Sequence, residues 1–250
     1  MTEEQTIAAL VADLKTLGVE SGDTILVHSS FKALGPVPGG IETVVEALIH
    51  AVGVAGTLLM PALSYMQEPR HVHHARHTPG CVGAVPEYFR LRLGTRRSLH
   101  PTHSVCGLGR HVDALFDEHA LDDTPCGPHS PFRKMVEYEA KIIMLGCSLR
   151  SNTTMHCIEE LVVPPYLFGE ERLYQITDLE GNTFQKTYRT HGFAGWAQRY
   201  DRVAELADTS FMRRGCVLKA ETHVLDTPGL KRAALAKLQE DPLFFVDRTA

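Results

Sequence analysis

The sequence predicts an α/β fold, in which a single domain carries a mixed β-sheet flanked by helices and a late antiparallel hairpin. Segments with helical hydrophobic spacing alternate with short apolar runs in the early part of the chain. Two runs of alternating hydrophobicity flank Gly181-Asn182, which is a typical hairpin turn. No repeat, low-complexity linker or change of composition divides residues 1–250, which suffice for a substantial core. We therefore expect one domain over the whole range.

Helices are expected where apolar residues recur every three or four positions or where start signals occur. The first helix opens with Thr2 and Gln5 in the two positions of a capping box. A helix in the middle of the chain opens with Ser130 and Pro131. The expected helical segments are 2–18, 41–52, 85–94, 111–120, 130–140, 152–163, 195–208 and 228–239.

Strands are expected in the short apolar runs between these helices. The strongest pattern of a buried strand is "KIIMLGC" at 141–147. Residues 64–83, rich in His, Pro and Gly, fit no regular element and are expected to form a long loop. The other expected strands are 24–30, 56–63, 104–109, the hairpin pair 172–178 and 183–189, and 216–225.

Composition and charge exclude several classes of protein. The chain is 44% hydrophobic and 22% charged, as in ordinary globular proteins, and its net charge of −5 disfavours binding to nucleic acid. The six cysteines occur singly without a CxxC spacing, which indicates reduced thiols. Neither an N-terminal signal nor an apolar run of about 20 residues is present. We therefore expect a cytoplasmic protein with no membrane partner.

The segment "HVHHARH" at 71–77 contains four histidines and raises the question of a metal site. Pro69 and Pro79 disfavour a helix here, and no acidic or cysteine ligand occurs at a known zinc spacing. We therefore predict no metal site and interpret the segment as a solvated loop over a site. The alternative is a metal-dependent hydrolase that combines residues 71–77 with His100 and His103.

Polar residues follow the first expected strand, where ligands of α/β proteins commonly bind. His28, Ser29 and Ser30 end this strand, and Lys32 comes shortly after. The segment matches neither the GxGxxG nor the P-loop pattern. It could hold a pyrophosphate through free backbone N–H groups, or it could be an ordinary turn.

A second polar turn precedes the expected strand at 104–109. Pro101 restricts His100 to extended geometry, which holds the following side chains in fixed directions. The hydroxyls of Thr102 and Ser104 could bind a phosphate or an amide-rich cofactor, or they could only cap the turn. The residues alone do not separate these two interpretations.

The helix at 152–163 presents ionisable side chains on one face. With Asn152 or Thr153 as the cap, His156, Glu159 and Glu160 occupy positions i, i+3 and i+4. A histidine there can take up a proton near neutral pH, and a carboxylate one turn along can support it or hold an ammonium group. A surface helix with a charge pair is the alternative interpretation.

Five stretches in the same order together resemble the antibiotic N-acetyltransferases of the aminoglycoside 3-N-acetyltransferase type. They span residues 15–165, and they are "GDTILVHSSFKALGPVPGG", "GTLLMPALSY", "HPTHSVCGLG", "GPHSPFRKM" and "IIMLGCSLRSNTTMHCIEE". The resemblance implies direct transfer of acetyl from acetyl-CoA to an amino group, N3 of an aminoglycoside, without a metal. The partner would be a small cationic amine, and a homodimer is an open option.

The resemblance also implies roles for individual residues. His156 would be the general base, and Glu159 would help to hold the cationic sugar. The residues implied to bind CoA are His28, Ser29, Ser30, Phe31, Leu34, Thr102, Ser104 and Ser130. A non-catalytic module that binds CoA or a drug would keep these turns but would not need His156.

One departure from the family pattern concerns the partner that orients His156. An acidic residue is expected after the hairpin, but Arg189 and His191 occur there. The orienting group could then be Glu159, Glu160 or Asp178. His191 would be a second catalytic histidine or a CoA contact.

Overall fold

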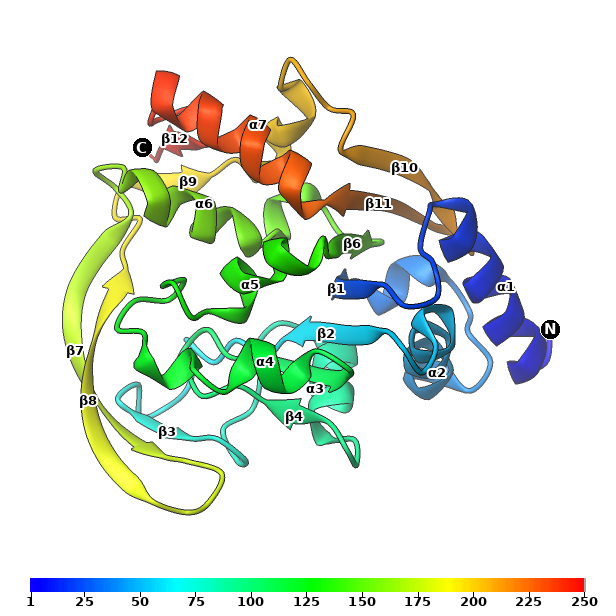
Figure 1. Ribbon diagram of the computed structural model, residues 1–250, viewed down its shortest axis with the longest axis horizontal. Coiled ribbons are helices and arrows are strands. Elements are labelled where there is room, and N and C mark those ends of the chain that lie inside the picture. The colour runs from blue at the N-terminus through cyan, green and yellow to red at the C-terminus, as the bar shows by residue number, and fades with distance from the viewer. Residues whose placement is uncertain (250) are drawn as a thin grey trace.

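The computed structural model describes residues 1–249 and is built on one seven-stranded mixed sheet (Figure 1). Three parallel strands form its centre, with β1 between β2 and β6. The flanking strands on both sides run antiparallel to their neighbours. In spatial order the strands are β10 (Met212–Val217), β11 (Ala220–Asp226), β6 (Lys141–Leu145), β1 (Thr24–Ser29), β2 (Thr57–Pro61), β5 (Val105–Gly109) and β4 (Arg96–Arg97).

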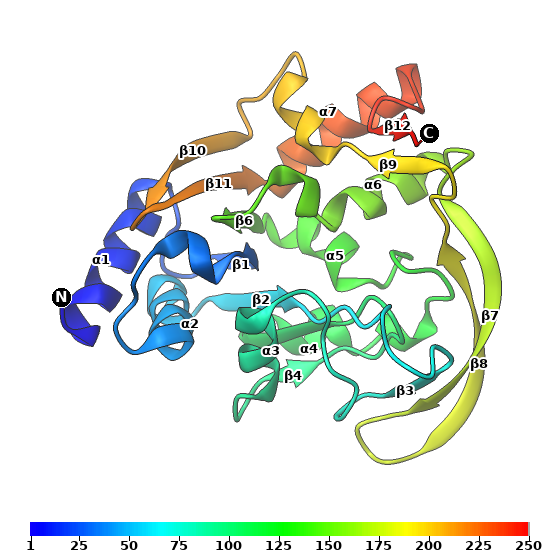
Figure 2. The ribbon, with the colours of Figure 1, turned by 180° about the vertical axis from the view of Figure 1, so that it is seen from behind.

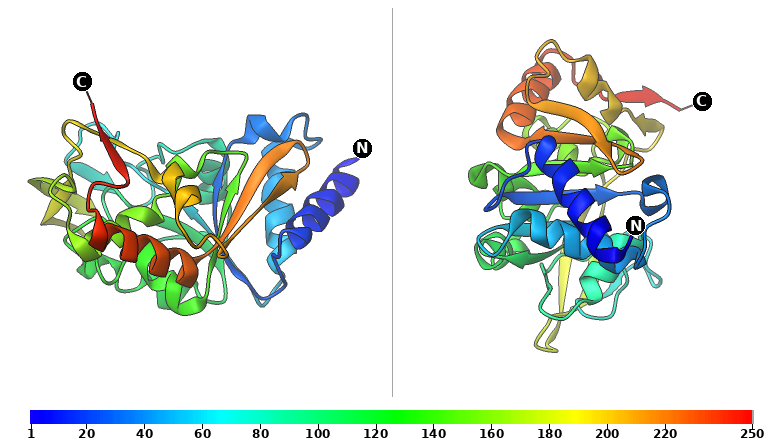
Figure 3. Two further views of the ribbon diagram at one scale, coloured as in Figure 1. Left: turned by 90° about the horizontal axis from the view of Figure 1, so that it is seen from above. Right: turned by 90° about the vertical axis from the view of Figure 1, so that its right-hand side faces the viewer.

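The central strands are buried on both faces because helices cover both sides of the sheet (Figure 3). Along β1, Leu26 packs in one hydrophobic cluster, while Ile25 and Val27 pack in the other. The cluster of Ile25 and Val27 includes residues of α1 (Glu3–Thr16), α2 (Gly40–Val52) and α3 (Ala84–Leu91). The cluster of Leu26 includes residues of α4 (Val112–Phe116), α5 (Pro131–Lys134), α6 (Thr154–Val162) and α7 (Thr227–Glu240).

A long antiparallel hairpin curves along one side of the molecule, seen at the left of Figure 1 and the right of Figure 2. It consists of β7 (Phe168–Thr177) and β8 (Thr183–His191), as the sequence predicts. A third strand, β3 (Val72–His74), pairs with β7 in parallel. The expectation that residues 64–83 contain no regular element is therefore wrong, because the backbone of β3 pairs with the hairpin.

Two other segments near the C-terminus differ from the prediction. Residues 195–208 form no α-helix, but a short strand β9 (Trp196–Gln198) and the 3₁₀ helix η5 (Tyr200–Glu205). β9 pairs with β12 (Val246–Arg248), a partner that lies far along the chain. Residues 216–225 belong to two strands, β10 and β11, because the chain reverses at Leu218, where φ is 51°.

The shorter predicted helices are interrupted. The segment 111–120 divides into α4 and the 3₁₀ helix η2 (His119–Leu121), and the segment 130–140 divides into α5 and η3 (Met135–Tyr138). Two more 3₁₀ turns follow strands of the sheet, η1 (Phe31–Leu34) after β1 and η4 (Leu149–Ser151) after β6. Among residues 1–249, no helix has the length and apolar character needed to cross a bilayer.

Candidate active site

A cleft of about 750 Å³ lies where the carboxyl ends of the central strands face α6 and the end of β8. Ligands of α/β proteins commonly bind at this edge of a sheet. One wall comes from the ends of β1, β2 and β6 and includes His28, Ser29 and Cys147. The other wall comes from α6, the hairpin and η5 and includes His156, His191 and Tyr200.

His156 lies in the first half of α6, and its ring is fixed from behind. At the start of this helix, Asn152 Oδ1 accepts a hydrogen bond from the backbone N–H of Thr154 at 3.1 Å. His156 Nδ1 lies 3.1 Å from Glu159 Oε2, one turn along, and 2.9 Å from the hydroxyl of Tyr200. When Nδ1 carries the proton and donates a hydrogen bond to Glu159, Nε2 has a free lone pair. That nitrogen can accept a proton.

Glu159 has an exposed fraction of 0%, and both of its oxygens are engaged. Tyr200 donates to Oε2 at 2.7 Å, and Tyr166 donates to Oε1 at 2.8 Å. Burial, followed by the charge of Glu159, raises the pKa of both phenols well above the ordinary range, so both remain donors. The carboxylate faces His156 and the two tyrosines and does not line the cleft, and the implied role of Glu159 in holding a cationic sugar stays a prediction.

Glu160 points to a different set of partners. His191 Nε2 and the backbone N–H of Cys126 each lie 2.8 Å from its Oε1, and Thr124 donates to its Oε2 at 2.6 Å. Burial raises the pKa of the Glu160 carboxyl, and the hydrogen bonds from Thr124 and Cys126 oppose that rise. Glu160 therefore ties a loop and the end of β8 to α6, and it fixes the ring of His191.

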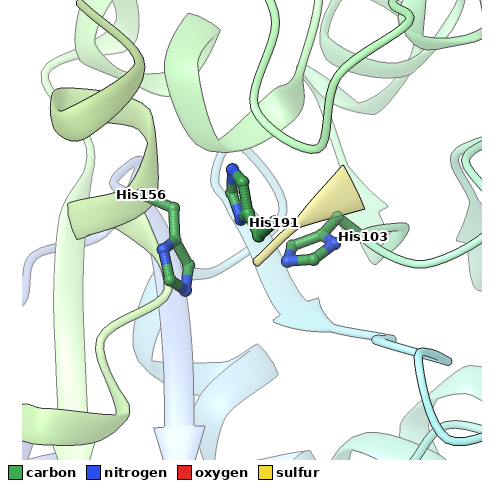
Figure 4. Close-up of side chains that lie close together, drawn as sticks. All are labelled: His103, His156 and His191. Carbon is green, nitrogen blue, oxygen red and sulfur yellow. The ribbon is translucent and has the colours of Figure 1, made fainter. Parts of the chain in front are cut away.

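Three histidine rings converge in the cleft (Figure 4). His103 comes from the turn before β5, His156 from α6 and His191 from the end of β8. The ring centroids of His156 and His191 are 4.7 Å apart, and those of His103 and His191 are 5.3 Å apart. Burial, followed by the nearby imidazoles, lowers the pKa of His103 and His191 well below the usual range, so both rings are neutral at neutral pH.

Several polar atoms of residues that line the cleft lack a partner within the protein. His28 Nε2, Ser29 Oγ and Asn152 Nδ2 are buried without a hydrogen bond, and all three residues line the cleft. Burial lowers the pKa of His28 to about 4, so its ring is neutral. Buried polar atoms without partners are costly unless a ligand or water satisfies them. These atoms therefore fit a polar ligand in the cleft.

The structure brings only part of the predicted site together. Thr102 lines the cleft, and its hydroxyl lies 2.9 Å from His103 Nδ1. Ser104 is fully buried, accepts from Arg97 and donates to the carbonyl of Ala62, so its hydroxyl supports the turn. The predicted CoA-binding residues that do not line the cleft are Ser30, Phe31, Leu34, Ser104 and Ser130.

The histidine-rich segment does not form the ligand set of the alternative hypothesis. His73 lies 3.2 Å from Gln67, and the ring centroid of His74 is 4.2 Å from that of His77. His100 stacks on His119 with the centroids 5.2 Å apart. Of the histidines in that hypothesis, only His103 lines the cleft.

The structure also excludes one candidate orienting group and adds two residues that the sequence did not indicate. Asp178 accepts hydrogen bonds from Glu180 and Asn182 in the hairpin turn and is not a partner of His156. Tyr166 and Tyr200 bind Glu159 from positions 7 and 41 residues further along the chain. No local pattern marks either tyrosine, because the contacts form only when α6 packs against the segments after it.

The comparison with known protein families decides the relationship of this chain. Residues 26–239 match the family described as aminoglycoside 3-N-acetyltransferase. The chain belongs to this family. The resemblance seen in the five sequence motifs is thereby confirmed, and with it the predicted fold class.

Curated relatives of this family member include aminoglycoside N(3)-acetyltransferases. It is 35% identical over 175 residues to aminoglycoside N(3)-acetyltransferase VII of Streptomyces paromomycinus, an alignment that covers 62% of this chain and 60% of that relative. It is 28% identical over 247 residues to aminoglycoside N(3)-acetyltransferase IV of a Salmonella species, covering 96% and 89%. The chain thus spans less than two thirds of the length of the first of these relatives.

Solved structures of similar fold cover nearly all of this family member. AAC-IIIb in a binary complex with CoASH superposes with a TM-score of 0.83 at 25% identity, covering 96% of this chain and 97% of that one. A variant of aminoglycoside acetyltransferase AAC(3)-IVa in complex with a gentamicin superposes with a TM-score of 0.81 at 27% identity, covering 95% and 90%.

Proposed function

We propose that the protein transfers the acetyl group of acetyl-CoA directly to an amino group, N3 of an aminoglycoside, with His156 as the general base and without a metal. The observation that carries this proposal is the array of Tyr200, Glu159 and His156, which leaves one imidazole nitrogen free at the cleft. Residues 1–250 would act as one acetyltransferase domain, since both hydrophobic clusters cover the faces of one sheet.

The proton transfers follow from the position of His156. An aminoglycoside amine is largely protonated at neutral pH, so it must lose a proton before its nitrogen can attack the thioester carbonyl. His156 takes this proton, and such a base contributes about 10²- to 10⁴-fold to the rate. The imidazolium then returns this proton to the sulfur of CoA as the C–S bond breaks. The attacking nitrogen loses its second proton to solvent as the neutral amide forms, so the enzyme ends unchanged.

The oxyanion formed by the attack needs hydrogen-bond donors. The Ser29 hydroxyl and the Asn152 amide are buried donors without partners, and both line the cleft with His156. Donors held in place before the reaction stabilise charge at little cost in reorganisation. We propose that one or both of these groups face the thioester oxygen.

The charges in the cleft favour binding of CoA more clearly than binding of a cationic amine. Its lining includes Arg70, Arg150 and Arg172, and among residues 1–249 no Asp or Glu lines it. Arginine guanidinium groups suit the phosphates of CoA. A polycationic acceptor would find no carboxylate among these lining residues. The test therefore uses one acyl donor, acetyl-CoA, and a range of amine acceptors.

The test measures release of the CoA thiol from acetyl-CoA in the presence of an amine panel. The panel holds aminoglycosides with a free 3-amino group, the same compounds acetylated at N3, uncharged monoamines and amines that carry a phosphate or carboxylate. We expect turnover with the free 3-amino compounds and none with the N3-acetylated ones. Turnover only with anionic or neutral amines would exclude the aminoglycoside, and no turnover with any amine would exclude acetyl transfer.

A further inference from the structure

The cluster of His103, His156 and His191 has the features of a metal site as well as those of a proton-transfer site. One nitrogen of each ring lies within 4.8 Å of one nitrogen of each other ring. Figure 4 shows the three rings around one gap, although they come from a turn, a helix and a strand end. Three neutral imidazoles with an open fourth position form a common ligand set for catalytic zinc.

The other nitrogen of each ring is already engaged. His103 Nδ1 lies 2.9 Å from the Thr102 hydroxyl, His156 Nδ1 lies 3.1 Å from Glu159, and His191 Nε2 lies 2.8 Å from Glu160. Histidine ligands of metals almost always donate their second ring N–H to a carboxylate, a carbonyl or water, which fixes the tautomer. Two of the three rings here have the carboxylate partner.

The free nitrogens are therefore Nε2 of His103, Nε2 of His156 and Nδ1 of His191. The last of these is buried and has no hydrogen-bond partner, and the side chain of His191 is only 7% exposed. A buried imidazole nitrogen without a partner is an unsatisfied lone pair, and coordination to a cation would satisfy it.

The spacing requires only a small adjustment. Zn–N bonds of about 2.0–2.1 Å in a tetrahedral site place the nitrogens about 3.3 Å apart. One nitrogen of each ring lies within 4.8 Å of the others, so such a set has to come closer by at most about 1.5 Å. Rotation of the rings and small shifts of the turn at His103 and the strand end at His191 can supply this. The fourth ligand position would face the cleft.

We propose that His103, His156 and His191 bind a divalent transition-metal ion, Zn²⁺ in the first instance, and that the bound ion inhibits acetyl transfer. The inhibition rests on the proposed function, whereas the binding does not. A coordinated Nε2 of His156 has no lone pair left to accept a proton, so catalysis and metal binding exclude each other. The ion also repels a protonated amine that approaches the same gap.

Binding is tested on protein stripped of metal with a chelator, by titration with Zn²⁺ in a calorimeter and with Co²⁺ as a spectroscopic probe. We expect one ion per chain and a visible absorption spectrum of tetrahedral Co²⁺. Loss of a residue that only hydrogen-bonds to a metal ligand lowers metal affinity about 10- to 100-fold. Loss of a ligand itself should lower the affinity at least as much. His103→Asn and His191→Asn should each do so.

Two control variants separate this site from other metal-binding groups. His77→Asn removes one ring of the His74–His77 pair outside the cleft, and Cys147→Ser removes a thiol that lines it. Both should bind Zn²⁺ as the wild type does. No binding by the wild type, or binding that survives both His103→Asn and His191→Asn, would overturn the proposed site.

Inhibition is measured as the initial rate of formation of the acetylated amine by mass spectrometry, because the released CoA thiol itself binds zinc. Equimolar Zn²⁺ should abolish the wild-type rate, and a chelator should restore it. Relative to its own metal-free rate, His103→Asn should require at least about tenfold more Zn²⁺ for half inhibition.

The outcomes separate this proposal from the proposed function. Zinc that binds the three histidines in a protein without transferase activity would leave the site valid and exclude the function. Transfer that zinc leaves unchanged or accelerates would exclude the inhibition.

Discussion

Glu159 and Glu160 are neighbours on α6, and each holds a histidine of the cleft, but their surroundings differ. The Glu159 carboxylate is bound by the side chains of Tyr166, Tyr200 and His156, and within residues 1–249 it accepts from no backbone N–H. Glu160 binds His191, but also Thr124 and a backbone N–H, so it joins separate segments of the chain. The difference suggests that Glu159 serves the reactivity of its histidine, while Glu160 mainly serves the stability of the fold.

The largest effect should come from the histidine that Glu159 orients. His156→Gln should lower kcat by about 10²- to 10⁴-fold, because it removes the base that accepts the proton of the amine. His77→Gln, on the histidine-rich segment outside the cleft, is the matched control and should keep the wild-type rate. Steady-state kinetics with acetyl-CoA and the best amine check this. A His156→Gln enzyme with normal turnover would remove the base from the mechanism.

The two glutamates themselves should separate rate from stability. Glu159→Gln should lower kcat by about 10- to 100-fold, a part of what the base contributes, with little change of KM because Glu159 does not line the cleft. Glu160→Gln should lower the melting temperature and have only a small effect on kcat. Kinetics and thermal unfolding of both variants decide. A raised KM with unchanged kcat in Glu159→Gln would instead support a role in holding the cationic substrate.

The two tyrosines bound to Glu159 should both support stability, but only Tyr200 should also affect the rate of transfer. Tyr166→Phe and Tyr200→Phe each remove a donor from a fully buried carboxylate, at a cost of about 1–3 kcal/mol. For a chain of this size, each kcal/mol lowers the melting temperature by about 2–4 °C. Only Tyr200→Phe should also slow the transfer, because its hydroxyl contacts His156. Equal effects of both variants on kcat would contradict the distinction.

Buried histidines without a carboxylate partner offer the smallest effect. Burial lowers the pKa of His28 to about 4 and those of His73 and His119 to about 3, below the ordinary value of 6.5. The unfolded chain therefore binds more protons below pH 6.5, and stability falls as the pH falls. Each group should cost about 0.7 kcal/mol between pH 7 and pH 6. Urea unfolding at both pH values measures the loss of unfolding free energy between pH 7 and pH 6. In His119→Gln this loss should be smaller by about 0.7 kcal/mol. A free energy of unfolding that rises toward pH 6 would contradict this account.

The part of the fold that the sequence predicts well is the part governed by local patterns. Continuous apolar runs identify β1, β2 and β6 because these strands are buried on both faces. The spacing of His156 and Glu159 places them on one face of α6, and their side chains do meet. The type of each central element and its position along the chain therefore follow from local apolar patterns.

The failures of prediction lie where distant contacts override local preference. The charged segment 195–208 has a helical pattern, but β9 pairs with β12, and Arg199 pairs with Asp201 and Asp247. The turn at Leu218 has a positive φ without glycine or asparagine, so no turn signal marks it. The residues of the site follow the same rule. Spacing finds His156 and Glu159, whereas Tyr166 and Tyr200 reach Glu159 only through tertiary packing.

The complete burial of Glu159 has a consequence for how the enzyme could change its substrate. In the proposed mechanism, the network that would activate His156 lies behind the cleft surface, and the acceptor would touch other residues, among them Arg172 and Tyr174 of the hairpin. Substitutions on the hairpin can therefore alter the charge and shape offered to the amine without disturbing the group that removes its proton. Evolution and protein engineering can then treat selectivity and proton transfer as independent traits of this scaffold.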